Sequence, residues 1–296
     1  MGEAALQEAA STMRQSFVAA ARLLREAGIG SPELDARLLL CHAARINQEA
    51  YVAEPERALL PAEQALYGRL IERRLDGEPV SRILGRREFY GRSFLVGRHT
   101  LDPRPDTETL VEAALAFLAR KGGRGRKLRL LDLGTGTGCL LLTLLAELER
   151  ATGVGTDVSA AALLLARANA RHLWLEARAR FVAGDWLDAV AGHFDLVVAN
   201  PPYLTTAEIG QLSREVRRHD PLVALDGGAD GLKAYRRIAA RAGEVLRPGG
   251  AILLEIGPTQ ADAVIALLRA AGLAVDAKAG LWHDLAGRPR VVLACA

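Results

Sequence analysis

The sequence has few cysteines and no long apolar run, and each of these absences excludes a class of protein. Its three cysteines, Cys41, Cys139 and Cys295, are far apart and odd in number, which argues against a disulfide framework and against a metal site. No apolar run reaches the roughly 18 residues that a membrane-spanning helix needs. The segment before Arg14 is mixed and polar and lacks the charged-then-apolar order of a secretion signal. We therefore expect a cytoplasmic protein with no membrane anchor.

Charge is distributed unevenly along the 296 residues. Residues 1–80 carry nine arginines against twelve acidic residues, a balance of −3, whereas residues 81–129 carry twelve basic against five acidic residues, a balance of +7. Because phosphate contacts dominate duplex affinity, the acidic front end argues against stable nucleic acid binding. We interpret the basic middle as a solvated linker, with a face for RNA or for an acidic protein as the alternative.

The first eighty residues have the apolar spacing of amphipathic helices. Apolar side chains recur at helical spacing over residues 17–27, and a glycine follows them. Ser31 is expected to cap a second helix that begins at Pro32, and Pro61 begins a third. We predict that residues 1–80 form a small helical bundle.

A different pattern follows these helices. Residues 87–96 predict a β-hairpin around residues 91–92, within a linker of residues 81–104, and Asp106 is expected to cap the next helix. Strands and helices then alternate, which predicts an α/β domain of residues 105–296 with a doubly wound, mainly parallel sheet. Such sheets bind ligands at the carboxyl ends of their strands. The expected strands are 128–133, 153–157, 180–183, 194–199, 251–256, 273–277 and 290–294.

A glycine-rich turn follows the first of these strands. Glycine lets a main chain turn sharply and approach a ligand with no side chain between them. A dinucleotide fingerprint wants its third glycine three positions after the second, but Cys139 stands there. The spacing fits the adenosyl and methionine parts of S-adenosyl-L-methionine better, so we predict that cofactor. Its predicted contacts in the turn are Gly134, Thr135, Gly136, Thr137 and Gly138.

Two later strand ends extend the predicted cofactor site. Asp157 ends the next strand, where a carboxylate can accept hydrogen bonds from both ribose hydroxyls. Asp185 and Trp186 follow the third strand and are candidates to bind the adenine amino group and to flank the ring. A tight structural turn and a core tryptophan are the alternatives at these positions.

An Asn-Pro-Pro-Tyr motif follows the strand at 194–199. Pro201 and Pro202 cannot continue a sheet, so the chain leaves it as a rigid, extended segment. This segment can present the side-chain carbonyl of Asn200 and the backbone carbonyl of Pro201 as two acceptors for a planar NH₂ group. Tyr203 is a candidate to stack on that group. The motif predicts methyl transfer to a planar nitrogen, because fixed acceptors orient a weak nucleophile and bind it more strongly as it becomes positive.

Taken together, the motifs resemble those of the HemK/PrmC family, the release factor glutamine methyltransferases. The resemblance covers nearly the whole chain, and two positions depart from it. Asp102 stands where the family usually has an apolar residue, and the first fifteen residues are expected to be an extension. The matching segments are 79–85, 88–90, 103–108, 132–138, 184–186, 200–203, 220–221, 224–232 and 284–290.

The resemblance implies a class I methyltransferase fold, Rossmann-like, with a mostly parallel seven-stranded sheet. It implies methylation at N5 of the glutamine in the Gly-Gly-Gln motif of class 1 peptide chain release factors, with residues 1–80 helping to dock that partner. Asn200 would also contact the cofactor, and residues 200–203 would form the glutamine site. We expect a monomer. The alternatives are a glutamine of a large-subunit ribosomal protein and, after base flipping, an adenine of DNA or RNA.

Overall fold

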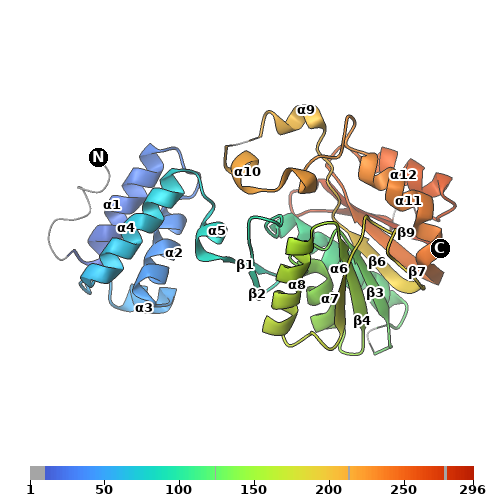
Figure 1. Ribbon diagram of the computed structural model, residues 1–296, viewed down its shortest axis with the longest axis horizontal. Helices are drawn as coiled ribbons and strands as arrows, with labels where there is room; N and C mark the ends of the chain where they lie inside the picture. Colours follow the sequence, from blue (N-terminus) through green and yellow to red (C-terminus); the bar gives the residue numbers. More distant parts are fainter. Residues whose placement is uncertain (1–10, 124, 213, 277–278) are drawn as a thin grey trace. The chain divides into compact units, whose positions relative to one another are not determined.

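The computed structural model describes residues 11–123, 125–212, 214–276 and 279–296 (Figure 1). It divides the chain into two compact units, Met1–Gly85 and Arg86–Ala296. The hairpin that we placed in a linker therefore groups with the second unit.

The described part of the first unit is a bundle of short helices around an aliphatic core. Tyr67 lies at its centre, and its hydroxyl donates to the backbone oxygen of Ala36 at 3.0 Å. Ser31 occupies the predicted N-cap position but makes no capping hydrogen bond with its side chain, because its hydroxyl donates to Asp35 at 3.0 Å. Asp35 also forms a buried ion pair with Arg74 at 2.7 Å. The helices are α1 (Met13–Glu26), α2 (Pro32–Ala44), α3 (Gln48–Ala53), α4 (Pro61–Leu75) and α5 (Val80–Leu84).

The second unit begins with the predicted hairpin, formed by β1 (Arg86–Phe89) and β2 (Arg92–Leu95). Its two-residue turn is Tyr90-Gly91, with φ angles of 51° and 70°. Positive φ at both central residues is the geometry that matches the twist of antiparallel strands. The turn therefore lies one residue earlier than the sequence predicted.

A seven-stranded sheet forms the centre of the second unit and confirms the predicted fold class. Five neighbouring strands of the sheet run parallel to one another. The two strands at one edge are added by antiparallel pairing. A strand was expected over residues 273–277, but residues 273–276 form only an isolated bridge at Ala274, and residue 277 lies outside the described part. The order is β5 (Ala179–Ala183), β4 (Thr152–Asp157), β3 (Arg129–Leu133), β6 (Phe194–Ala199), β7 (Leu246–Glu255), β9 (Pro289–Cys295) and β8 (Leu281–His283).

Helices cover both faces of this sheet (Figure 1). One face packs against α6 (Glu108–Arg120), α7 (Cys139–Glu147) and α8 (Ala160–His172), and the other against α11 (Lys233–Val245) and α12 (Ala261–Ala270). Each face of the sheet forms a hydrophobic core with the helices that cover it, and successive residues of a central strand point to one core and then to the other. Both kinds of position are therefore buried, which explains why the central strands are almost continuously apolar. None of the described helices is long and apolar enough to span a membrane.

The chain order of the strands locates the ligand site. From β3 the chain proceeds outward through β4 and β5, then returns to the other side of β3 as β6 and continues to β7. The carboxyl ends of β3 and β6 therefore flank the point where the order reverses, which is where open α/β sheets bind ligands. Short segments α9 (Thr206–Ile209), α10 (Arg214–His219) and η2 (Leu222–Ala224) follow β6.

Candidate active site

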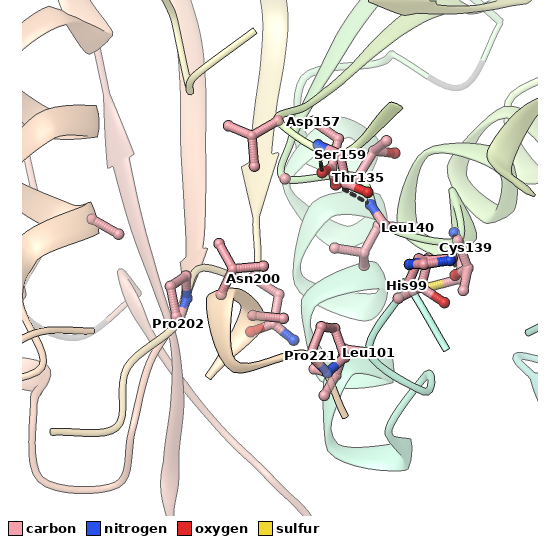
Figure 2. Close-up of a pocket in the computed structure, with 18 of the residues that line it drawn as sticks. His99, Leu101, Thr135, Cys139, Leu140, Asp157, Ser159, Asn200, Pro202 and Pro221 are labelled. Carbon is pink, nitrogen blue, oxygen red and sulfur yellow. Dashed lines mark hydrogen bonds between the residues drawn. The ribbon is translucent and has the colours of Figure 1, made fainter. Parts of the chain in front are cut away.

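A cavity of about 320 Å³ lies at the carboxyl ends of β3, β4, β5 and β6. Figure 2 shows Thr135, Asp157 and Asn200 around this one cavity. Gly138, Pro201 and Tyr203 lie outside the set of described residues that line it. The predicted residues that do line it are Gly134, Thr135, Gly136, Thr137, Asp157, Asp185, Trp186, Asn200 and Pro202.

The glycine turn after β3 has the backbone conformation that glycine permits. Gly134, Gly136 and Gly138 have φ angles of 68°, 53° and 80°, where a side chain would strain the main chain. A Cβ atom at Gly138 would lie 3.1 Å from Leu142 and 3.3 Å from Ala166. Gly138 therefore permits the close packing of the turn against its helices, while Gly134 and Gly136 form the wall of the cavity.

Asp157 is held in place by main-chain donors. Its Oδ2 accepts from the backbone nitrogen of Gly136 at 2.9 Å, and its Oδ1 accepts from that of Ser159 at 2.9 Å. A carboxylate oxygen can accept more than one hydrogen bond. Both oxygens can therefore receive a hydroxyl from a bound ribose while the loop keeps the carboxylate in position.

The turn after β5 forms another part of the wall. Trp186 has a φ angle of 54°, and a Cβ atom at Gly134 would lie 3.4 Å from its ring. The indole thus lies close to the glycine turn. Asp185 is paired with Arg237, which also contacts Asp188 at 3.2 Å. Arg237 itself also lines the cavity.

Asn200 is the first residue after β6, and it reaches the cavity from the sheet. Its Nδ2 donates to the hydroxyl of Thr107 at 3.1 Å. The Tyr203 side chain packs against the core between the sheet and helices α11 and α12, and its backbone oxygen accepts from Gln260 at 2.9 Å. Burial raises the pKa of the Tyr203 phenol, so its hydroxyl stays protonated at neutral pH. Stacking of Tyr203 on an acceptor stays a prediction.

Two buried acids lie close to this wall. Asp132 accepts from the hydroxyl of Thr135 at 2.6 Å, and burial raises its pKa to about 7. Burial also raises the pKa of Glu255 to about 7, against hydrogen bonds from Thr107 and Asn200 that lower it. Glu255 ends β7, and the residue before it, Leu254, pairs with Ala199, the residue before Asn200.

Residues 99–104, between β2 and η1 (Pro105–Thr107), also line the cavity. Pro103 and Arg104 belong to the 103–108 segment that resembles the family, whereas residues 99–101 were not indicated by the sequence. Asp102 is buried here at 7 % exposure, in the position where an apolar residue was expected. Asp106 is not the predicted cap, because it forms an ion pair with Arg290 at 3.0 Å.

Cys139 lines the cavity as well, at the start of α7. Burial raises the pKa of its thiol to about 12. A neutral thiol is a poor nucleophile, so the structure gives Cys139 no nucleophilic role.

The two units match different family descriptions. Residues 5–85 match the PrmC N-terminal domain, and residues 108–215 match the methyltransferase small domain. The first match begins at residue 5, so our prediction that fifteen residues precede the family pattern was wrong.

Relatives are similar along nearly the whole chain. A release factor glutamine methyltransferase of Bradyrhizobium diazoefficiens is 50% identical over 92% of this chain and 90% of its own. One of Rhodospirillum rubrum is 46% identical over 99% of this chain and 88% of its own. Among solved structures, the hMettl16 catalytic domain in complex with MAT2A 3'UTR hairpin 6 has a TM-score of 0.56. It is 18% identical and covers 74% of this chain and 82% of its own, which supports the fold alone. The chain belongs to the family of release factor glutamine methyltransferases.

Proposed function

We propose that this chain methylates the side-chain amide nitrogen, N5, of the glutamine in the Gly-Gly-Gln motif of class 1 peptide chain release factors. One observation carries the proposal. Asn200, with its amide nitrogen already bonded to Thr107, lies in the same cavity as the glycine turn and Asp157. That arrangement leaves an amide oxygen to receive an NH₂ group beside a nucleoside site.

S-adenosyl-L-methionine is the methyl donor, and its sulfonium carries the methyl group that is transferred. Gly134 and Gly136 would let the main chain approach it closely, and Asp157, held by two backbone nitrogens, would accept from the ribose hydroxyls. The indole of Trp186 would flank the adenine. Asp185, one of whose oxygens is engaged by Arg237, would accept from the adenine amino group.

Asn200 and Pro201 make the glutamine nitrogen reactive by orienting it. An amide nitrogen is a weak nucleophile because its lone pair is delocalised. The Asn200 side-chain oxygen and the Pro201 backbone oxygen each accept one hydrogen of the glutamine NH₂, which directs the nitrogen toward the methyl group. The bound cofactor would supply an electrophilic methyl group, whose bond to sulfur would break, with the electron pair left on sulfur, as the bond to the glutamine nitrogen forms. The nitrogen becomes positive, so the same two dipoles bind it more strongly. It then releases a proton to water, and no dedicated base is required.

We also propose the biological setting that goes with this activity. Residues 1–80 help to dock the release factor, residues 81–104 connect them to the catalytic domain of residues 105–296, and the enzyme acts as a cytoplasmic monomer. Stable nucleic acid binding is not expected from the acidic first eighty residues.

The test is incubation of the protein with methyl-labelled S-adenosyl-L-methionine and a purified class 1 release factor. Peptide mass mapping should place the label on the glutamine of the Gly-Gly-Gln motif. A release factor with that glutamine replaced by alanine is the matched control and should stay unlabelled. Ribosomal protein and duplex DNA are offered in parallel. Label on either of them, with none on the release factor, would refute the proposal in favour of the corresponding alternative.

A further inference from the structure

An ion pair joins two parts of the cavity wall that are far apart in the chain. Nη2 of Arg104 donates to Oδ2 of Asp220 at 2.6 Å, across 116 positions of the sequence. The Asp220 side chain is 5 % exposed, whereas that of Arg104 is 44 % exposed and lines the cavity. Both residues belong to segments that resemble the family, 103–108 and 220–221, and the proposed function uses neither of them.

Arg104 extends from a backbone that is held in place. It lies between Pro103 and Pro105, which restrict the main chain, and its φ and ψ angles of −101° and 142° are those of an extended chain. Asp106 anchors the same segment through its ion pair with Arg290, at 3.0 Å, and the Arg290 side chain is 5 % exposed. The 99–104 wall therefore ends at a fixed point, from which Arg104 can hold another part of the chain.

Residues 220–226 form the opposite wall as a compact turn. Three backbone hydrogen bonds of 2.9–3.0 Å close the turn within residues 221–226. At its far end Leu204 and Asp226 form a bridge, which joins the turn to the chain just after the Asn-Pro-Pro-Tyr motif. The ion pair with Arg104 holds its near end, at Asp220. The side chains of this turn that line the cavity are Pro221, Val223, Ala224 and Asp226.

These two walls meet at the acceptor end of the cavity. Figure 2 shows Leu101 and Pro221, one from each wall, close together on the side of Asn200 that is away from Asp157. Because Asp157 marks the ribose site, the walls face the acceptor and not the nucleoside. A glycine-rich peptide has much conformational freedom to lose when it binds, and a preorganised surface lowers that cost.

We propose that Arg104 and Asp220 are positioning residues whose ion pair holds the 220–226 wall against the 99–104 wall, as the surface that binds the Gly-Gly-Gln peptide of the release factor. The inference rests on the proposed function, since it assigns the peptide a binding surface beside the glutamine site. A surface that binds the peptide equally before and during methyl transfer contributes to KM and leaves kcat unchanged. The affinity for S-adenosyl-L-methionine should also be retained, because the pair lies away from the ribose site.

Arg104→Met removes the charge and keeps an unbranched side chain. We expect the KM for a purified class 1 release factor to rise about tenfold, at the low end for a charged hydrogen bond because Arg104 is half-exposed. The value of kcat should stay within about twofold, and the affinity for S-adenosyl-L-methionine should be unchanged. Because a single hydrogen bond joins the pair, Arg104→Lys keeps the charge that it needs, and its KM should stay within about threefold of the unsubstituted value.

Arg247→Met is the matched control. Arg247 pairs with Asp195 at 2.7 Å, its side chain is 41 % exposed, and it lies outside the described residues that line the cavity. The KM, kcat and cofactor affinity of this variant should equal those of the unsubstituted protein. A KM that rises equally in Arg247→Met and Arg104→Met would overturn the inference.

Asp220→Asn tests whether Arg104 and Asp220 act through one contact. Since each substitution removes the same ion pair, the variant that carries both Arg104→Met and Asp220→Asn should have about the KM of the weaker-binding single variant. Losses that multiply in the double variant would mean that the two residues act independently, and the inference would fail.

Amide hydrogen exchange of residues 221–226, followed by mass spectrometry, provides a readout that needs no release factor. Exchange should be at least about tenfold faster in Arg104→Met than in the unsubstituted protein or in Arg247→Met. Unchanged exchange in Arg104→Met, an unchanged KM, or a KM that rises together with a loss of cofactor affinity would overturn the inference. If the unsubstituted protein does not methylate the release factor, the proposed function fails, and the exchange rates still decide whether the ion pair holds the wall.

Discussion

The cofactor half of the cavity is built mostly from main-chain atoms, whereas the acceptor half depends on side chains. On the cofactor side, two backbone nitrogens hold Asp157 and glycines form the wall. On the acceptor side, the side-chain amide of Asn200 is held by the hydroxyl of Thr107. Main-chain geometry is set by the turn itself, while the orientation of an amide must be set by its neighbours. We therefore expect the two halves to fail in different ways when they are altered.

The largest effect should follow Asn200→Ala. Removing the amide oxygen removes one of the two acceptors that orient the glutamine nitrogen and bind its developing charge. We expect kcat to fall about 1,000-fold, with the affinity for S-adenosyl-L-methionine within about twofold of the unsubstituted value. Single-turnover methyl transfer reports on the acceptor half of the cavity, and calorimetric binding of S-adenosyl-L-methionine reports on the cofactor half. Full turnover by this variant would contradict the mechanism in which Asn200 and Pro201 orient the glutamine nitrogen.

Asp157→Ala should produce the opposite pattern. Loss of hydrogen bonds from two ribose hydroxyls to a charged group should weaken cofactor binding about 100-fold, with little change in kcat at saturating cofactor. Asp188→Ala is a matched control, because Asp188 is exposed and does not line the cavity. Equal losses of affinity in both variants would mean that Asp157 does not bind the ribose.

The buried acid of the cofactor half should make stability depend on pH. Burial raises the pKa of Asp132 to about 7, above the 3.8 of an unperturbed aspartate. The folded state then binds more protons than the unfolded state, so this acid lowers stability as pH rises from about 4 to about 7. Asp132→Asn cannot ionise. Its free energy of unfolding, relative to the unsubstituted protein, should rise by about 2 kcal/mol between pH 5 and pH 8. Denaturant titrations at the two pH values measure this, and a constant difference would show that Asp132 is not the titrating group.

The smallest effect should follow Gly134→Ala. A side chain at a φ angle of 68° strains the turn by about 1–2 kcal/mol, so cofactor affinity should fall about tenfold. Gly272→Ala introduces the same kind of strain at a φ angle of 83°, away from the cavity and with open space around the Cβ position. The control should lose stability but keep its affinity. Unchanged affinity in Gly134→Ala would mean that the turn can relax without disturbing the ligand.

Local patterns were sufficient to predict the fold class and the part of the cavity wall that the strand ends form. The glycine turn, Asp157 and Asn200 each lie at the carboxyl end of a strand, and parallel strands bring those ends together. The short helices α3 and α5 were not predicted, because six and five residues are too few to show a helical period.

Two local capping predictions failed because of contacts with other side chains. Ser31 was expected to cap α2 with its hydroxyl, but that hydroxyl donates to Asp35, which is buried and paired with Arg74. Asp106 was expected to cap α6, but it is paired with Arg290. In both cases a charged side chain competed successfully with a nearby backbone donor.

The sequence by itself determined where the chain turns, which strands are buried and which residue types stand at the strand ends. Those properties depend on neighbouring residues, so they can be predicted from spacing alone. Only the tertiary structure decided that Thr107 and Asn200, 93 positions apart, are joined by a hydrogen bond. That contact depends on the packing of η1 against the end of β6, which no local pattern specifies.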